Sequence, residues 1–277
     1  MAIQVSNEPD AFRAFELDAW NQASTDYERV FGPVTAQTTG AILDIARVSA
    51  GSKLLDVCTG HGVLALAASQ RGAVVSAVDF AEAMLAAARR NVPGADCRLA
   101  DAQALPYADN TFDAVVCGYG LPHVPQPDRA LAEMCRVLRP GGRVAISVWE
   151  RPSPTNGAGL LMSAVRAHGR LDLGLPHAPD PFQFGDLDVM KAALVEAGFD
   201  DVDATPVEQA LFLKTATGLT DTLLQAAVRT KALLVRQDPA ARQAITDAIA
   251  QGVENRFRCP GGFRVPMTAV VGSGAKR

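Results

Sequence analysis

The sequence predicts an α/β protein built on a doubly wound, mostly parallel sheet with helices on both faces. From Lys53 onward, apolar strand patterns alternate with helix-forming segments through short loops, as in repeated strand–helix–strand units. Three successive strands each end in an aspartate, namely Asp56, Asp79 and Asp101, and a glycine-containing turn follows the first of them. Because ligands of doubly wound sheets bind at these strand ends, the pattern predicts a binding crevice there.

The composition fits a globular protein with a large core. The chain has 277 residues, of which 48% are hydrophobic, and a net charge of −4 with no basic run, so strong electrostatic binding to nucleic acid is not expected. No apolar run approaches the roughly 20 residues of a membrane span, and Met1–Trp20 lacks the pattern of a signal peptide. A cytoplasmic location is therefore expected. The five cysteines contain no Cys-x-x-Cys pair and predict neither a disulfide framework nor a zinc site.

The amino-terminal segment, residues 10–48, is predicted to be helical, with a break at Gly32-Pro33. Trp20, Tyr27 and Phe31 recur at helical spacings and give it a large apolar face. Either this face merely covers a sheet edge, or it forms a lid whose aromatic residues close over a ligand. Periodicity alone leaves both interpretations open.

The central part of the chain carries the regular alternation. Its predicted elements are strands at 53–56, 73–78, 97–100, 112–117 and 143–149, a helix from Val63, and helices at 81–90 and 128–138. The pattern then loosens. The predicted elements are helices at 160–167, 186–197, 219–235 and 239–257, a sixth strand at 202–213 and a last strand at 263–271.

One structural domain with three parts is expected. The parts are an N-terminal helical lid (1–50), a ligand-binding core (51–150), and the remainder of the sheet with a substrate-side loop and inserted helices (151–277).

The first strand–turn–helix unit indicates a nucleotide-like ligand. Gly60 and Gly62 let a ligand approach the backbone, and the following helix N-terminus favours a negatively charged ligand group. Asp79, 17 residues after Gly62, suits a carboxylate that accepts hydrogen bonds from a ribose diol. Asp101 could accept from an adenine amino group, and Asp56 could brace the turn and hold a cationic amino group.

These motifs resemble those of class I S-adenosylmethionine-dependent methyltransferases, most closely the subgroup with the ubiquinone and menaquinone C-methyltransferases. The resemblance is carried by four segments: Leu-Leu-Asp-Val-Cys-Thr-Gly-His-Gly at 54–62, Val-Asp-Phe-Ala-Glu-Ala-Met-Leu at 78–85, the stretch 101–113, and Leu-Arg-Pro-Gly-Gly at 138–142. Cys58 departs from the glycine of many members. The resemblance implies a Rossmann-like, seven-stranded sheet whose last strand is antiparallel.

The resemblance also implies an enzyme of small-molecule or secondary metabolism. It would transfer a methyl group from S-adenosylmethionine, leaving S-adenosylhomocysteine, to an acceptor that we expect to be hydrophobic or aromatic. O-, N- and C-methylation stay open, and no metal is required. The residues expected to bind the donor are Asp56, Cys58, Gly60, Gly62, Asp79, Phe80, Met84, Asp101, Ala102, Cys117 and Tyr27.

His123 is the candidate general base, because it follows the fourth strand and histidine titrates near neutral pH. The alternative is a loop histidine that shapes the cofactor pocket. His61, inside the glycine turn, is expected to point outward. The candidates for the substrate pocket are Phe31, Tyr119, Trp149 and Phe182.

Two other functions are compatible with parts of this sequence. A protein of this fold could bind the donor without transferring methyl, as a cyclase or a regulatory binding module. A nicotinamide-dependent oxidoreductase is more remote: Gly60-His61-Gly62-Val63-Leu64-Ala65 satisfies the dinucleotide fingerprint, but that function gives no account of residues 101–113. The oligomeric state stays open, with a homodimer as one expectation.

Overall fold

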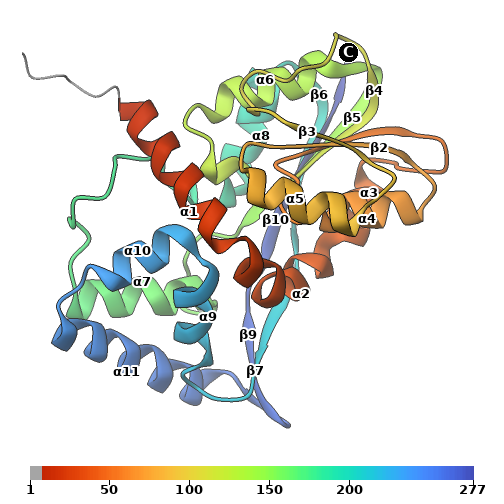
Figure 1. Ribbon diagram of the computed structural model, residues 1–277. Helices are drawn as coiled ribbons and strands as arrows, with labels where there is room; N and C mark the ends of the chain where they lie inside the picture. The colour runs from red at the N-terminus through yellow and green to blue at the C-terminus, as the bar shows by residue number, and fades with distance from the viewer. Residues whose placement is uncertain (1–7) are drawn as a thin grey trace, which may run out of the picture.

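The computed structural model describes residues 8–277, so the first seven residues of the predicted lid, 1–50, lie outside the described part. Within it, seven strands form the main sheet in the order β3-β2-β1-β4-β5-β10-β6 (Figure 1). β10 is antiparallel to both β5 and β6, and the other neighbours are parallel. The sequence-predicted fold class is thereby confirmed. The strands are β1 (Lys53–Val57), β2 (Val74–Asp79), β3 (Asp96–Leu99), β4 (Phe112–Gly118), β5 (Leu138–Trp149), β6 (Phe199–Val207) and β10 (Ala269–Lys276).

The helices fall into an N-terminal group, a group on the sheet and a group near the C-terminus. They are α1 (Glu8–Val30), α2 (Gly32–Thr35), α3 (Thr39–Ile45), α4 (Val63–Gln70), α5 (Glu82–Asn91), α6 (Pro127–Val137), α7 (Gly157–His168), α8 (Leu187–Glu196), α9 (Gly218–Ala226), α10 (Val228–Val235) and α11 (Pro239–Arg256). Three short 3₁₀ turns, at Ala36–Thr38, Leu121–His123 and Gln183–Gly185, connect some of them.

The main sheet is buried on both faces, which explains the continuous apolar runs of its strands. Successive strand residues point to opposite faces, so Leu55 and Val115 join one core cluster while Leu54 and Val116 join another. The first cluster includes apolar residues of α6 and α8, and the second includes those of α3 and α4. The two helical layers fix the strand ends, and with them the loops that carry the motifs.

The two predicted strands at 202–213 and 263–271 are each divided in the structure. β6 pairs with β10 in the main sheet, whereas β7 (Ala210–Leu213) pairs with β9 (Gly262–Pro266) in a separate three-stranded sheet with β8 (Arg258–Cys259). The division falls at Gln209, whose side chain is buried and donates to the Tyr119 hydroxyl at 2.8 Å. Periodicity within each strand continues across this bend, so the sequence pattern predicts one strand instead of two.

The predicted helix at 219–235 is also divided, into α9 and α10, because Ala227 adopts an extended conformation between them. These two helices pack with α7 and α11 around a further hydrophobic core, separate from the two clusters of the main sheet. It includes Leu161, Leu223 and Ile249. Figure 1 shows this helical group beside the main sheet, with α1 lying across the space between them. α1 contacts α5 on one side and α9 and α10 on the other. Within residues 8–277, no helix combines the length and apolar character needed to cross a membrane.

Candidate functional site

A pocket of about 970 Å³, counted out to its open mouth, lies where β1, β2 and β4 end and α1 passes over them. The sheet reverses its strand order between β1 and β4, which is where doubly wound sheets bind ligands. Its charged or ionisable lining residues are Arg13, Tyr27, Asp56, Cys58, His61, Asp79, Asp101, Tyr119 and His123.

The floor of the pocket is the turn after β1, whose backbone is left-handed at Cys58 (φ 56°), Gly60 (φ 56°) and Gly62 (φ 88°). A Cβ at Gly62 would lie 3.2 Å from the Cα of Ala88 on α5, so glycine allows the turn to pack against that helix. A Cβ at Gly120 would lie 2.3 Å from the Cβ of Cys58. The turns after β1 and β4 therefore fit together only because Gly120 has no side chain.

Asp56, at the end of β1, is buried and is only partly satisfied by the protein. Its Oδ2 accepts from the Thr59 hydroxyl at 2.7 Å and from the Ala65 backbone N–H at 3.1 Å, while Oδ1 is buried without a partner. Burial raises the pKa of Asp56 to about 7, although the bonds from Thr59 and Ala65 oppose the rise. A buried acceptor without a donor is costly, so a cationic ligand group would be favourable there.

Asp79, at the end of β2, organises the turn from the opposite side. Its carboxylate accepts from the backbone N–H of Gly60 at 2.8 Å and of Ala81 at 2.9 Å. Burial raises the pKa of Asp79 to about 6, while these backbone bonds lower it. Both carboxylate oxygens thus have one protein donor each, and each retains capacity to accept another hydrogen bond.

Asp101 follows β3 and faces the N-terminal helix. Its Oδ1 accepts from the backbone and side chain of Gln103, and its Oδ2 accepts from Arg13 Nε at 3.1 Å. Partial burial opposes ionisation, yet these bonds hold the pKa of Asp101 below its usual value. Asp101 is therefore an ionised carboxylate joined to α1.

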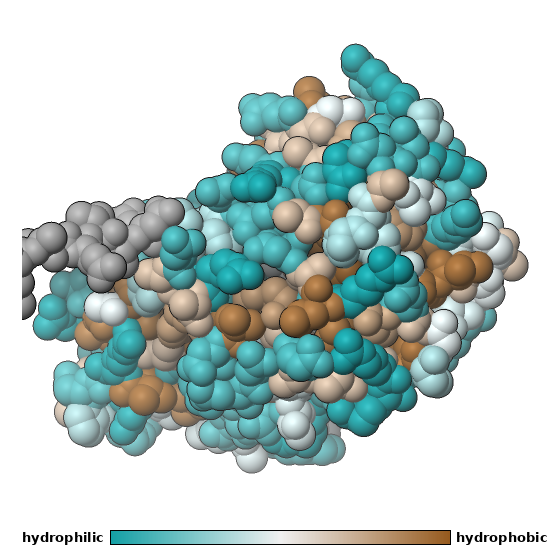
Figure 2. All heavy atoms as spheres, turned by 45° about the horizontal axis from the view of Figure 1, so that its top comes forward, coloured by the Kyte–Doolittle hydropathy of each residue, from teal (hydrophilic) through white to brown (hydrophobic). Residues whose placement is uncertain are grey.

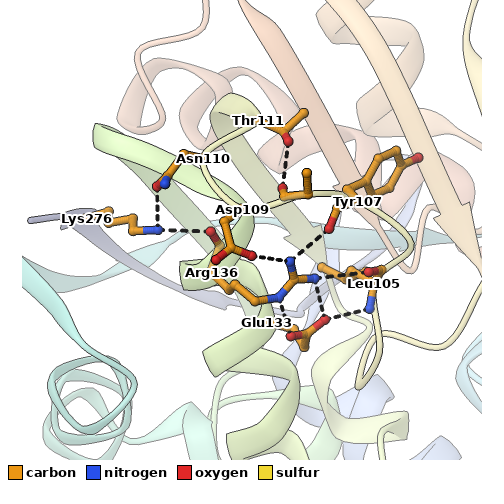
Figure 3. Close-up of polar contacts among 9 residues, drawn as sticks. Leu105, Tyr107, Asp109, Asn110, Thr111, Glu133, Arg136 and Lys276 are labelled. Atoms are coloured by element: carbon orange, nitrogen blue, oxygen red, sulfur yellow. Dashed lines mark hydrogen bonds and ion pairs between the residues drawn. The ribbon is translucent and has the colours of Figure 1, made fainter.

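The stretch 101–113 is held in place by Arg136 of α6, as Figure 3 shows. This guanidinium donates to Glu133, to Asp109 at 2.7 Å, and to the backbone carbonyls of Tyr107 at 2.8 Å and Leu105 at 3.0 Å. Glu133 in turn accepts from the Leu105 N–H at 2.7 Å. One partly buried guanidinium thus fixes the polar part of this loop, while Leu105 and Phe112 anchor it in the core.

Aromatic side chains of α1 and the adjoining turns form the cover of the pocket. The Tyr27 ring lies 5.0 Å from that of Trp20, 5.6 Å from Phe31 and 5.9 Å from His61, measured between ring centroids. Figure 2 shows hydrophobic residues gathered across the middle of one face, between more hydrophilic surfaces. The result is a largely apolar chamber next to the three carboxylates.

Tyr119 closes the inner wall. Its hydroxyl lies 3.1 Å from Thr38 Oγ1 and accepts from Gln209, and its ring lies 4.3 Å from that of Trp149. Burial raises the pKa of Tyr119 to about 12, so the phenol is neutral near pH 7.

His123, in the turn after β4, faces the pocket and contacts α1. Its Nδ1 lies 2.8 Å from Oε2 of Glu16, and its ring makes an edge contact with Trp20 at 4.8 Å. Trp20 Nε1 donates to the same carboxylate oxygen at 3.0 Å.

The structure brings most of the sequence-predicted site residues together. Those that line the pocket are Tyr27, Asp56, Cys58, Gly60, Asp79, Phe80, Met84, Asp101, Ala102, Tyr119 and His123. Gly62 shapes the turn from behind, and Cys117 is buried in the core below it. Phe31 and Trp149 stack behind Tyr27 and Tyr119. Phe182 lies in the loop before the last 3₁₀ turn and is not among the lining residues.

His61 contradicts the sequence-based expectation that it points outward. It is 8% exposed, lines the pocket below Tyr27, and has a buried Nδ1 without a partner. Burial lowers its pKa, which favours the neutral imidazole. A Cβ at Gly32 would lie 3.2 Å from its Nε2, so the break between α1 and α2 makes room for the ring.

Sequence reasoning missed Arg13 and Glu16 on α1 and Thr35, Thr38 and Ile42 beyond it. Arg13, Glu16, Trp20 and Tyr27 follow one another at spacings of three, four and seven along α1, so they share one helix face. The spacing is visible in the sequence. However, a charged residue such as Glu16 on a helix is expected to face solvent unless its buried partner, here His123, is known.

The residues present fit S-adenosylmethionine. The unpartnered Oδ1 of Asp56 suits the ammonium of its aminoacyl part, Asp79 retains acceptor capacity for a ribose diol, and the apolar walls near Met84 and Ala102 suit a purine.

Comparison with known proteins also indicates a methyltransferase. Residues 55–146 match the family model of the methyltransferase domain. A demethylmenaquinone methyltransferase of Renibacterium salmoninarum is 39% identical over 112 residues, 40% of this chain and 47% of the relative. The chain thus spans about half the length of the curated relatives it matches.

Two solved structures share the fold over most of the chain. A Haemonchus contortus phosphoethanolamine N-methyltransferase, in complex with phosphomonomethylethanolamine and S-adenosylhomocysteine, has a TM-score of 0.57 at 18% identity and covers 99% of this chain and 61% of its own. The [4+2]-cyclase SpnF has a TM-score of 0.50 at 20% identity, covering 87% of this chain and 81% of its own. At these identities the likeness concerns the fold alone.

Residues 55–146 match the methyltransferase domain, and the sheet that holds them has the seven strands and the antiparallel last strand that the resemblance implied. The sequence match lies within the half that holds the glycine turn and the three carboxylates.

Proposed function

We propose that this protein is a methyltransferase that passes a methyl group from S-adenosylmethionine to a small hydrophobic or aromatic molecule. The observation that carries the proposal is the buried, unpartnered Oδ1 of Asp56 beside Asp79 and Asp101, under an aromatic cover. A nicotinamide cofactor offers no comparable ammonium group for that oxygen.

Each part of the site has a separate task. Asp56 would hold the amino group of the donor, Asp79 its ribose and Asp101 its adenine, with Gly60 and Gly62 leaving the backbone open. When bound, the donor supplies an electrophilic methyl group on a sulfonium sulfur. The protein contributes by orienting the reactants and excluding water, since methyl transfer depends largely on positioning.

The acceptor is expected on the side of the aromatic cover. Trp20, Tyr27, His61 and Tyr119 offer rings and few free charges, which favours an apolar planar acceptor. The relatives named as demethylmenaquinone methyltransferases support a quinone-like acceptor, although their match covers the donor half of the chain. α1 would act as the lid, since its residues Arg13, Trp20 and Tyr27 line the pocket from the side of the helical group.

The remaining expectations concern the whole protein. A cytoplasmic location, independence from nucleic acid and a homodimer stay predictions from the sequence.

Transfer of radiolabelled methyl from S-adenosylmethionine to a panel of acceptors tests the proposal. The panel contains a short-chain reduced demethylmenaquinone, 1-naphthol and 1-naphthylamine as apolar acceptors, with phosphoethanolamine and transfer RNA as polar ones. We expect label in an apolar product, and none with Asp56→Asn under the same conditions. Label only in phosphoethanolamine or RNA would refute the proposed acceptor class.

One alternative has a specific observation behind it. The cyclase with the same fold shows that this architecture also serves other chemistry. Tight binding of S-adenosylmethionine without label transfer to any acceptor would favour a protein that binds the donor without using its methyl group.

A further inference from the structure

The contact between α1 and the turn after β4 is built like a carboxylate–histidine pair of an acid–base site. The side chain of Glu16 is fully buried. One of its carboxylate oxygens, Oε2, is within hydrogen-bonding distance of both His123 Nδ1 and Trp20 Nε1. Its Oε1 is buried and has no hydrogen-bond partner within residues 8–277. Burying a carboxylate this way is costly, and a purely apolar residue would join the two elements at lower cost.

Two charged groups from other elements act on this pair. Asp79 of the core acts on His123 through space, and Arg229 of α10 acts on Glu16. The Arg229 guanidinium lies over the Phe12 ring at 5.4 Å and the Phe15 ring at 6.0 Å, next to Glu16 on α1. Arg229 thus places a positive charge on the side of Glu16, and an ionised carboxylate accepts hydrogen bonds and cannot donate them.

Trp20 and an ionised Glu16 together indicate which ring nitrogen of His123 carries the hydrogen. The indole N–H can only donate, so Oε2 of Glu16 is an acceptor toward Trp20. An ionised Glu16 accepts from His123 as well, which places the hydrogen on Nδ1. Nε2 then carries the lone pair, and it has no hydrogen-bond partner within the described residues, while the ring lines the pocket.

We propose that Glu16 is a positioning residue that fixes the tautomer of His123, so that Nε2 accepts a proton from the methyl acceptor. This deepens the proposed function and rests on it. The acceptor is then a molecule that loses a hydrogen on methylation: a hydroxyl, an N–H or an acidic C–H. As the acceptor atom bonds to the methyl carbon and the bond from that carbon to sulfur breaks, the proton goes to Nε2. The ionised Glu16 stabilises the imidazolium that forms.

Nitrogen-15 NMR of the histidine rings tests this directly on the full chain with S-adenosylhomocysteine present. The chain has four histidines, and His123→Gln assigns the resonances of interest. We expect the neutral His123 ring to carry its hydrogen on Nδ1, and Glu16→Leu to shift the ring toward the Nε2–H form. The matched control on the same helix is Asp18→Asn, which removes an exposed carboxylate that accepts from Gln22 and should leave the tautomer unchanged.

Two NMR results would overturn the proposal: an Nε2–H tautomer in the unmodified protein, or an Nδ1–H tautomer that persists without Glu16. Should Glu16→Leu fail to fold, Glu16→Gln keeps the shape and removes the charge. For that variant, turnover at saturating acceptor should fall by about tenfold to a hundredfold while the dissociation constant of S-adenosylhomocysteine changes less than about twofold. Unchanged turnover would contradict the proposal. If the unmodified protein does not bind S-adenosylhomocysteine at all, the proposed function itself is refuted.

Discussion

At the scale of single residues, the site depends on carboxylates that the protein buries without fully satisfying. Asp56 and Asp79 both have raised pKa values, to about 7 and about 6 from 3.8, because burial opposes their ionisation. In the folded state these groups bind protons more readily than in the unfolded chain. Their contribution to the free energy of unfolding is therefore full below pH 4 and is lost as the pH rises through 6 to 7.

Donor binding should depend on pH in the opposite sense. In the proposed site the ammonium of the donor pairs with ionised Asp56, so the affinity for S-adenosylhomocysteine should rise by about tenfold to thirtyfold between pH 5.5 and pH 8. Calorimetric titrations at several pH values measure this change. Asp56→Asn should bind more weakly and with little pH dependence; a variant with an undiminished pH dependence would show that another group is responsible.

Asp79→Ala tests the ribose site. Loss of a charge-assisted pair of hydrogen bonds should weaken donor binding by about 2 kcal/mol, or roughly thirtyfold. Asp96→Ala, which removes an exposed partner of Arg98 at the start of β3, is the control and should bind normally. If Asp79→Ala binds the donor as tightly as the unmodified protein, the assignment of Asp79 to the ribose is incorrect.

The sequence predicted the positions of the three aspartates better than those of Glu16 and His61. Asp56, Asp79 and Asp101 stand at strand ends, where the fold itself brings them together, so their position follows from the alternation of elements. Glu16 and His61 belong to pairings between segments far apart in the chain, and no local pattern indicates which partner buries them. Phe182 was expected in the pocket and does not line it. It lies in a loop before a 3₁₀ turn, and hydrophobic periodicity does not predict the path of such a loop.

At the scale of elements, the loop 101–113 depends on one side chain of α6. Arg136→Leu removes hydrogen bonds to two carboxylates and to the carbonyls of Leu105 and Tyr107. We expect a loss of about 2 kcal/mol in the free energy of unfolding, because the partly buried carbonyls of Leu105 and Tyr107 and the Glu133 carboxylate lose their donor, together with weaker donor binding. Chemical denaturation and hydrogen exchange of residues 101–113 measure both effects.

Arg139→Leu is the matched control for that experiment. Arg139 is exposed and pairs with Asp113, so its removal should cost less than about 1 kcal/mol and leave donor binding intact. Equal losses for the two variants would show that Arg136 contributes only as one more surface charge.

The boundaries of the last strands show where sequence patterns stop being informative. Residues 202–213 and 263–271 each keep strand-like character throughout, and the structure bends both at the same level. The bend is set by the burial of Gln209 against Tyr119, a contact between residues 90 positions apart. The alternation from β1 to β5 was predictable because it is local, whereas this bend is not.

At the scale of the whole molecule, α1 joins the two halves. It contacts α5 beside the main sheet and α9 and α10 of the helical group, and its pocket-facing side carries Arg13, Glu16, Trp20 and Tyr27. The core thus provides the glycine turn and the three aspartates, and α1 covers them with contacts to the C-terminal helices. The division explains why the family match is confined to residues 55–146.

The central claim is that the pocket at the ends of β1, β2 and β4 binds S-adenosylmethionine. Calorimetric titration of the full chain with S-adenosylmethionine, S-adenosylhomocysteine and NAD tests it most directly. The account predicts saturable binding of both sulfur compounds at one site, weakened by Asp56→Asn, and no comparable binding of NAD. Tight binding of NAD with no response to either sulfur compound would contradict it.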